Sequence, residues 1–276
     1  MKTSAGGLSV PHSLHLLVTN RCNLACRQCY YRSRSGEWGW EEARALVAEV
    51  AELGVSWLAL GGGEPLLWEP LPRLLDQARS LGIKTTVTTN GTLLRPIRPD
   101  RVHVSHDPMH LTSRQQVLTA LAFYRSHQAE VGINARADDL SFLESLPYPE
   151  VDHVVYLLPK PAWNPDPRHW QQVWDLAREY PERVWLDACL ARLFCRIGLL
   201  RSSLPCRQGL TSMSLQPDQQ AGPCSNLPSP VRWQPGRLQE TWDRVRGIPP
   251  CFMDYDDPPD SVRLTEERGP GEEPHR

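Results

Sequence analysis

The sequence has no long hydrophobic run. Hydrophobic residues make up 40% of its 276 residues, but no apolar stretch approaches the roughly 20 residues that span a bilayer as a helix. The first eleven residues, Met1 to Pro11, are polar and contain glycine, so they lack the apolar segment of a signal peptide. We therefore expect a cytoplasmic protein with no membrane partner.

Neither sign of charge is in excess. The chain has 30 Lys and Arg against 32 Asp and Glu, for a formal net charge of -2, so no overall positive field favours nucleic acid. The sequence also contains neither the G-x-G-x-x-G dinucleotide fingerprint nor the G-K-[ST] phosphate loop. These absences argue against a nucleic-acid partner and against two common kinds of nucleotide site.

Eight cysteines stand out in such a chain. In the cytoplasm, cysteines are reduced thiols or metal ligands, so a disulfide framework is not expected. Cys22, Cys26 and Cys29 follow an apolar stretch with the spacing C-x3-C-x2-C. A closed [4Fe-4S] site has four thiolates. Three thiolates leave one iron open to a small molecule, much as a catalytic zinc keeps an open position. Zinc binding, or clustered thiols without a metal, is the alternative.

Three further segments follow the cysteines: the glycine-rich residues 60–67, residues 88–94 and residues 104–107. In this order, the four segments resemble the motifs of the radical SAM superfamily, and the resemblance covers residues 13 to 160. Gln28 occupies a position that is usually aromatic in that family, and Tyr30 is the adjacent aromatic residue.

The resemblance implies a [4Fe-4S] cluster held by Cys22, Cys26 and Cys29, which are also the catalytic residues. It also implies that S-adenosyl-L-methionine binds at the open iron. Residues expected to contact this cofactor are Tyr30, Gly62, Gly63, Glu64, Asn90, Ser105, Asp107 and Arg136.

Glu64 and Arg136 also have alternative interpretations that involve no cofactor. Glycines after an apolar stretch allow positive φ and close approach of a ligand, and the Glu64 carboxylate suits an ammonium group. The alternative for Glu64 is an exposed acid in a tight strand-to-helix turn. Arg136 is placed to reach the cofactor carboxylate or a substrate anion, and its alternative is a solvated strand end.

Apolar stretches alternate with helical patterns along the first half of the chain. Strands are expected at 13–19, 55–60, 84–89, 102–105, 131–135 and 153–158, and helices at 41–53, 71–81, 113–128 and 141–146. This alternation predicts parallel strands joined by right-handed crossovers. We expect an α/β fold, a partial (β/α)6 TIM-type barrel, with catalytic groups at the carboxyl ends of the strands.

Alternation along the fourth strand separates two faces. Val102 and Val104 suit the helix-covered side, so His103, Ser105 and Asp107 are expected to point inward. The histidines at 103, 106 and 110 fall on mixed faces, which argues against a metal site formed by them.

A second cysteine group lies beyond the predicted barrel, at Cys189, Cys195, Cys206, Cys224 and Cys251. Residues 206–224 predict a β-hairpin with a Pro-Asp turn, and residues 237–245 predict a short helix. This arrangement resembles the SPASM and twitch extensions of radical SAM enzymes, with Gln219 in place of their glycine.

One auxiliary iron-sulfur cluster is implied, with Cys206, Cys224, Cys251 and Cys189 as its metal ligands; Cys189 is preferred because it follows the strand-like residues 183–186. Zinc is the alternative metal, because four thiolates suit it equally well. Cys195 then remains as a packed thiol or as a hydrogen donor that quenches a radical.

The expected domains are a radical SAM barrel at 1–180, a small C-terminal hairpin and helix extension that binds the auxiliary cluster at 181–255, and a disordered tail at 256–276. The tail is charged and rich in proline.

The resemblance implies reductive cleavage of S-adenosyl-L-methionine and removal of a hydrogen atom from an unactivated C–H bond. A flavodoxin or ferredoxin is the expected low-potential electron donor. The substrate is a peptide or a small molecule, and the barrel's start close to residue 1 mildly favours a small molecule or a peptide bound directly in the barrel. The alternatives are a zinc- or cluster-stapled binding protein and an electron carrier.

Overall fold

The computed structural model describes residues 8–26, 29, 36–107, 112–137, 150–158, 167–200, 208–226 and 229–248. Several sequence predictions fall outside these residues: Tyr30, Cys206, Cys251, the helix at 141–146 and the tail at 256–276.

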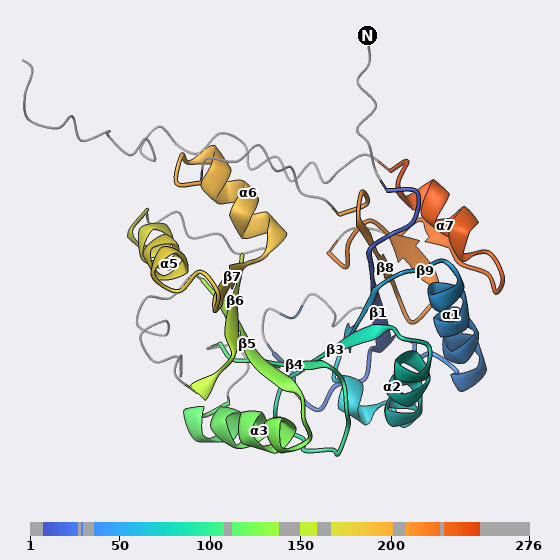
Figure 1. Ribbon diagram of the computed structural model, residues 1–276, viewed down its shortest axis with the longest axis horizontal. Coiled ribbons are helices and arrows are strands. Elements are labelled where there is room, and N and C mark those ends of the chain that lie inside the picture. Colours follow the sequence, from blue (N-terminus) through green and yellow to red (C-terminus); the bar gives the residue numbers. More distant parts are fainter. Residues whose placement is uncertain are drawn as a thin grey trace, which may run out of the picture.

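Ten strands of the described residues form one sheet, in the order β10-β9-β8-β1-β2-β3-β4-β5-β6-β7. Their bounds are β1 Ser13–Thr19, β2 Trp57–Gly62, β3 Lys84–Thr89, β4 Arg101–Ser105, β5 Glu130–Arg136, β6 His153–Leu157, β7 Val184–Leu186, β8 Ser212–Leu215, β9 Gln220–Gly222 and β10 Val231–Arg232. From β8 through β7 every neighbouring pair is parallel. The strands form an open arc with helices on its outer side (Figure 1), which confirms the partial barrel.

The helices are α1 Trp40–Glu52, α2 Leu71–Ser80, α3 Arg114–Ser126, α5 Pro167–Glu179, α6 Ala188–Arg196 and α7 Leu238–Val245, with a 3-10 turn, η1, at Pro65–Leu67. Helix α3 begins at a capping box in which Ser113 and Gln116 exchange side-chain and backbone hydrogen bonds, and this motif satisfies two N–H groups that a helix start leaves open. Among the described helices, none is long and apolar enough to cross a membrane.

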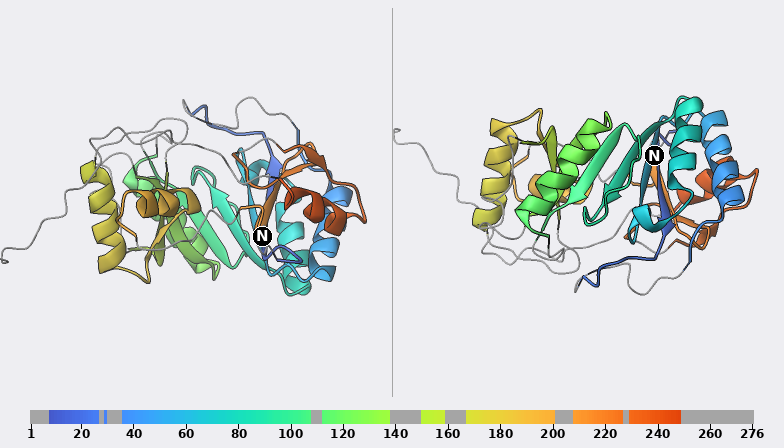
Figure 2. Two further views of the ribbon diagram at one scale, coloured as in Figure 1. Left: turned by 90° about the horizontal axis from the view of Figure 1, so that it is seen from above. Right: turned by 90° about the horizontal axis from the view of Figure 1, so that it is seen from below.

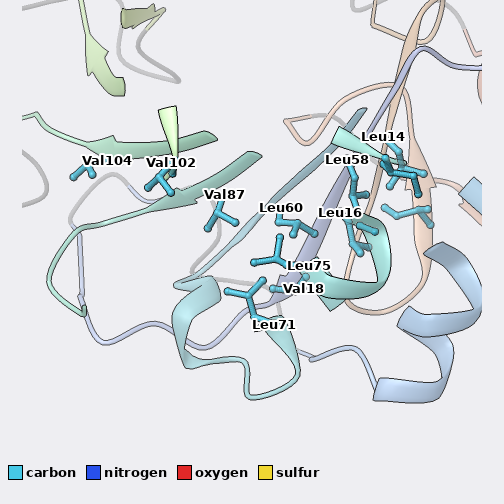
Figure 3. Packing of buried hydrophobic residues seen from close by; sticks show 14 of the residues in the cluster. Leu14, Leu16, Val18, Leu58, Leu60, Leu71, Leu75, Val87, Val102 and Val104 are labelled. Carbon is cyan, nitrogen blue, oxygen red and sulfur yellow. The ribbon is translucent and has the colours of Figure 1, made fainter. Parts of the chain in front are cut away.

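The core lies between the outer face of the sheet and its covering helices. Leu71 and Leu75 of α2 pack toward Leu60 of β2 and Val18 of β1 (Figure 3). Burial of such side chains is the main favourable term in folding. Val102 and Val104 of β4 are fully buried in the same core, so the predicted outward face of this strand is confirmed.

The C-terminal hairpin joins the barrel sheet. Strand β8 pairs in parallel with β1, and β9 pairs antiparallel with β8, so the predicted hairpin is confirmed. Gln219 in its turn has φ 65°, a left-handed conformation that glycine adopts most readily. Figure 2 shows the hairpin of β8 and β9, together with α7, beside α1. Strand β7 also extends the sheet beyond residue 180. The domain boundaries at 180 and 255 stay predictions.

Candidate active site

The first three cysteines lie directly after β1, at the carboxyl edge of the sheet. Cys22 is exposed, and Cys26 and Cys29 are partly exposed; none of the three forms a disulfide. Burial, and after it the neighbouring thiols, raises the pKa of Cys26 above its usual range. Burial likewise raises the pKa of Cys22. Thiolates at this place therefore need a positive centre, which the irons of a bound cluster supply, so the residues present fit such a group.

No group of three or more His, Cys, Asp or Glu within the described ranges is close enough to hold a single metal ion. A [4Fe-4S] cluster does not require such a group, since each thiolate binds a different iron.

Two glycines let the end of β2 run against the cysteine segment. A Cβ on Gly62 would lie 2.3 Å from the carbonyl oxygen of Thr19, and a Cβ on Gly63 would lie 2.3 Å from that of Arg21. The N–H groups of Gly63 and Glu64 donate to these same carbonyl oxygens, at 2.7 and 2.8 Å. The glycines thus fix the chain that carries the cysteines, a close approach that only a residue without a side chain allows.

Glu64 is fully buried. Its carboxylate accepts hydrogen bonds from the N–H of Leu66 at 3.1 Å, the hydroxyl of Thr89 at 2.9 Å and the N–H of Asn90 at 2.8 Å. The alternative of an exposed acid is therefore wrong. The side chain ties the end of β2 to the end of β3.

Asn90 carries this connection on to the cysteine segment. Its Nδ2 donates to Oδ1 of Asn23 at 2.9 Å and lies 3.9 Å from Sγ of Cys22. Its Oδ1 accepts from the N–H of Thr92 at 3.0 Å. The ends of β1, β2 and β3 thus form one hydrogen-bonded unit around Cys22.

Asp107, Ser105 and Arg136 lie at the ends of the next two strands. Asp107 is buried, and its negative charge contributes to the raised pKa of Cys26, so this carboxylate lies near Cys26. Ser105 ends β4 and Arg136 ends β5, on the same edge of the sheet. The structure therefore brings Cys22, Cys26, Cys29, Glu64, Asn90 and Asp107 together.

Three members of the second cysteine group lie within the described residues. Cys189 lies in the first turn of α6, Cys195 in its last turn, and Cys224 two residues after β9. Strands β7 and β9 stand near opposite ends of the strand order. The choice of these residues as ligands stays a prediction.

Sequence reasoning missed Asn23, Thr89 and Thr92. All three carry short hydrogen-bonding side chains at the end of a strand or within four residues after it, and this is the signal that points to them. Besides local bonds, such as that from the hydroxyl of Thr92 to Oδ1 of Asn90, their side chains bond to residues 25 to 69 positions away in the sequence, and local pattern alone cannot predict these pairs.

Residues 16–111 match the family model described as Radical SAM superfamily. Fe-coproporphyrin III synthase of Methanosarcina barkeri is 37% identical over 81 residues, which are 28% of this chain and 20% of that protein. PqqA peptide cyclase of Xanthomonas oryzae pv. oryzae is 38% identical over 88 residues, 29% of this chain and 23% of that protein. The chain thus spans about a fifth of the length of these curated relatives.

The fold is similar to that of SuiB from Streptococcus suis, solved in complex with the precursor peptide SuiA. The TM-score is 0.65 at 17% identity, and the match covers 87% of this chain and 67% of SuiB. At this identity the likeness concerns the fold.

Proposed function

We propose that this chain, whose residues 16–111 match the radical SAM superfamily model, reductively cleaves S-adenosyl-L-methionine and removes a hydrogen atom from an unactivated C–H bond of its substrate. One observation carries the proposal: three cysteines on one segment, without a disulfide partner among them, are fixed at the carboxyl edge of the barrel by the ends of β2 and β3. That edge is where barrel enzymes hold their catalytic groups.

In this proposal Cys22, Cys26 and Cys29 hold a [4Fe-4S] cluster. When bound, the cluster supplies one electron for cleavage of the sulfonium, which yields methionine and a 5'-deoxyadenosyl radical. The protein's part is to bind, orient and exclude water. The glycine segment at 62–63 brings backbone groups to the amino-acid end of the cofactor.

Other groups hold the remaining parts of the cofactor. Ser105 and Asp107 approach its ribose or carboxylate, and Arg136 pairs with a carboxylate at the end of β5. Tyr30 supplies an aromatic surface. Glu64 and Asn90 act by holding the loops in register, because their polar atoms are already engaged by neighbouring segments.

We propose an auxiliary iron-sulfur cluster held by Cys189, Cys206, Cys224 and Cys251. The hairpin ahead of Cys224 and the helix α7, both expected from the resemblance to SPASM and twitch extensions, support it. Zinc stays the alternative metal, since four thiolates suit it as well.

The substrate we propose is a peptide or a small molecule. The likeness to SuiB, solved with a precursor peptide, and to a peptide cyclase supports the first, and the likeness to a coproporphyrin synthase supports the second. A flavodoxin or ferredoxin supplies the electron. Reduced cysteines suit the cytoplasm, where we place the protein.

The test is anaerobic reconstitution followed by analysis of iron and sulfide, and then of the products formed from S-adenosyl-L-methionine with dithionite. We expect about four irons per cluster, with 5'-deoxyadenosine and methionine in equal amounts. Protein that binds zinc and no iron would indicate a non-catalytic binding module whose fold is stabilised by zinc. Iron without 5'-deoxyadenosine would point to an electron carrier.

A further inference from the structure

Two polar side chains on the inner face of the sheet make no hydrogen bond within the described residues: the imidazole of His15 in β1 and the hydroxyl of Thr88 in β3. Their inward direction follows from alternation along the strands, since Leu14, Leu16 and Val87 lie in the outer core (Figure 3). Both side chains are partly exposed. A molecule at the inner face of the barrel can therefore reach both.

Gly61 of β2 lies between these two side chains. The pairing of Leu60 with Val87 sets it beside Thr88 on the neighbouring strand. A Cβ on Gly61 would lie 3.0 Å from Nε2 of His15, so the imidazole leans over β2 with this nitrogen foremost. Glycine inside a strand often marks a place where a ligand comes close.

This glycine differs from the two that follow it. A Cβ on Gly62 or Gly63 would meet a backbone carbonyl oxygen at 2.3 Å, whereas the atoms nearest a Cβ on Gly61 belong to the side chains of His15 and Leu17. Gly62 and Gly63 thus bring two backbones together, and Gly61 leaves room on the inner face. Because Gly62 and Gly63 are proposed contacts of the cofactor, Nε2 of His15 lies next to the place where the cofactor is held.

The imidazole of His15 is neutral near pH 7. Burial lowers its pKa to about 4, and among the described residues no charged side chain adds to this shift. A neutral imidazole has one nitrogen that donates and one that accepts, and the hydroxyl of Thr88 can do either. The two side chains therefore suit a neutral group that itself donates and accepts, while an ion would find no opposite charge beside His15.

Two further imidazoles of the inner face are already engaged. Nε2 of His103 lies 2.6 Å from Nε2 of His153, and the side chain of Asn134 hydrogen-bonds to His103. Oε1 of Glu130 lies 3.1 Å from Nδ1 of His153. This group satisfies itself, so an incoming molecule finds open polar groups at His15 instead.

We infer that His15 and Thr88 form a subsite that binds an amide or hydroxyl group of the substrate across Gly61. An amide fits both halves of the subsite, since its C=O accepts and its N–H donates. The inference rests on the proposed function, because this group belongs to the molecule from which the radical takes hydrogen, held beside the cofactor segment at 62–63.

The test is a titration of the full-length chain, labelled with 15N-histidine, at pH 7. N-methylacetamide is the neutral probe, because it has the N–H and C=O of a peptide group, and acetate and methylammonium are the charged probes. We expect N-methylacetamide, and neither ion, to shift the 15N resonances of His15, which are assigned by their loss in His15→Gln. The resonances of His127, at the end of α3, should stay in place.

Two variants test the two sides of the subsite. Thr88→Val keeps the branched shape and removes the hydroxyl, so it should weaken the titration about tenfold, the effect of one lost hydrogen bond. Thr119→Val, at an exposed position of α3, is the matched control and should leave the titration unchanged. Gly61→Val places a side chain against the imidazole and should abolish the shift. Thr88→Val retains every histidine, so the resonances report whether this variant is folded.

An equal shift with either ion, no shift with N-methylacetamide, or an unchanged titration in Thr88→Val would overturn the inference. The titration needs neither cluster nor S-adenosyl-L-methionine, and 5'-deoxyadenosine formation is measured separately. A positive titration without 5'-deoxyadenosine would therefore contradict the proposed function, and the reverse result would contradict the subsite alone.

Discussion

The two cysteine groups differ in how the chain assembles them. Cys22, Cys26 and Cys29 lie on one short segment that the ends of β2 and β3 fix by hydrogen bonds. In the second group, Cys189 sits on α6 and Cys224 follows β9, near opposite ends of the sheet order. A site encoded by short spacing needs only local geometry, whereas a site assembled from distant elements depends on the whole fold.

Cysteine substitutions should separate the two groups most strongly. Cys22→Ala, Cys26→Ala or Cys29→Ala should each abolish 5'-deoxyadenosine formation, because the first cluster loses a ligand. Cys224→Ala should keep that activity and lower the iron content of the reconstituted protein from about eight to about four per chain, one cluster fewer. Iron analysis and product chromatography measure both. If all three N-terminal variants still formed 5'-deoxyadenosine, the expected difference in role between the two cysteine groups would be contradicted.

Gly63→Ala tests whether backbone approach fixes the first group. The new Cβ would lie 2.3 Å from the carbonyl oxygen of Arg21, so we expect a loss of about 2–3 kcal/mol in the free energy of unfolding, in the range typical of overpacking. Gly247→Ala is the control, since its Cβ would meet nothing closer than 3.5 Å. Denaturant unfolding of both variants gives the comparison, and equal stability would contradict the account.

Glu64→Gln tests the buried carboxylate that joins β2 to β3. The glutamine amide would place its NH2 group against N–H or O–H groups that now donate to the carboxylate. A buried hydrogen bond that is not made costs about 1–3 kcal/mol. We expect a loss of about 2 kcal/mol in the free energy of unfolding. Glu52→Gln, at an exposed position at the end of α1, should change the free energy of unfolding little. Similar losses in both variants would show that the hydrogen bonds of Glu64 between β2 and β3 are unimportant for stability.

Alkylation rates should show the smallest effect. Because the pKa values of Cys22 and Cys26 are raised, less thiolate is present at pH 8 and iodoacetamide should react more slowly than with free cysteine. Asp107→Asn removes a charge that raises the pKa of Cys26, so it should speed modification of Cys26 about twofold. Mass spectrometry of the apoprotein measures this. Asp76→Asn, exposed on α2, is the control, and no difference between the two variants would contradict the assigned electrostatics.

The sequence alone predicts the barrel well where hydrophobic periodicity and secondary-structure propensity agree. The strands at 13–19 and 84–89 were predicted with the bounds of β1 and β3, because each is an apolar or β-branched run between turn residues. Helices α5 and α6 were not predicted. Asp187 accepts a hydrogen bond from the N–H of Leu190 at 2.7 Å, so the start of α6 carries a capping signal in the sequence.

The site was predicted in part. The positions of Glu64 and Asn90 follow from their motifs, but the hydrogen bond between Glu64 and the N–H of Asn90 joins residues 26 apart. The pairing of β8 with β1 joins residues almost 200 apart along the chain. Such contacts depend on how the strands are ordered, which local periodicity does not contain.

The electron paramagnetic resonance spectrum of the reduced, reconstituted protein tests the central claim most directly, namely that the N-terminal cluster keeps an iron with no protein ligand. Measured on Cys224→Ala, which isolates that cluster, the spectrum should change when S-adenosyl-L-methionine is added. A cluster signal that is identical with and without S-adenosyl-L-methionine would contradict the account.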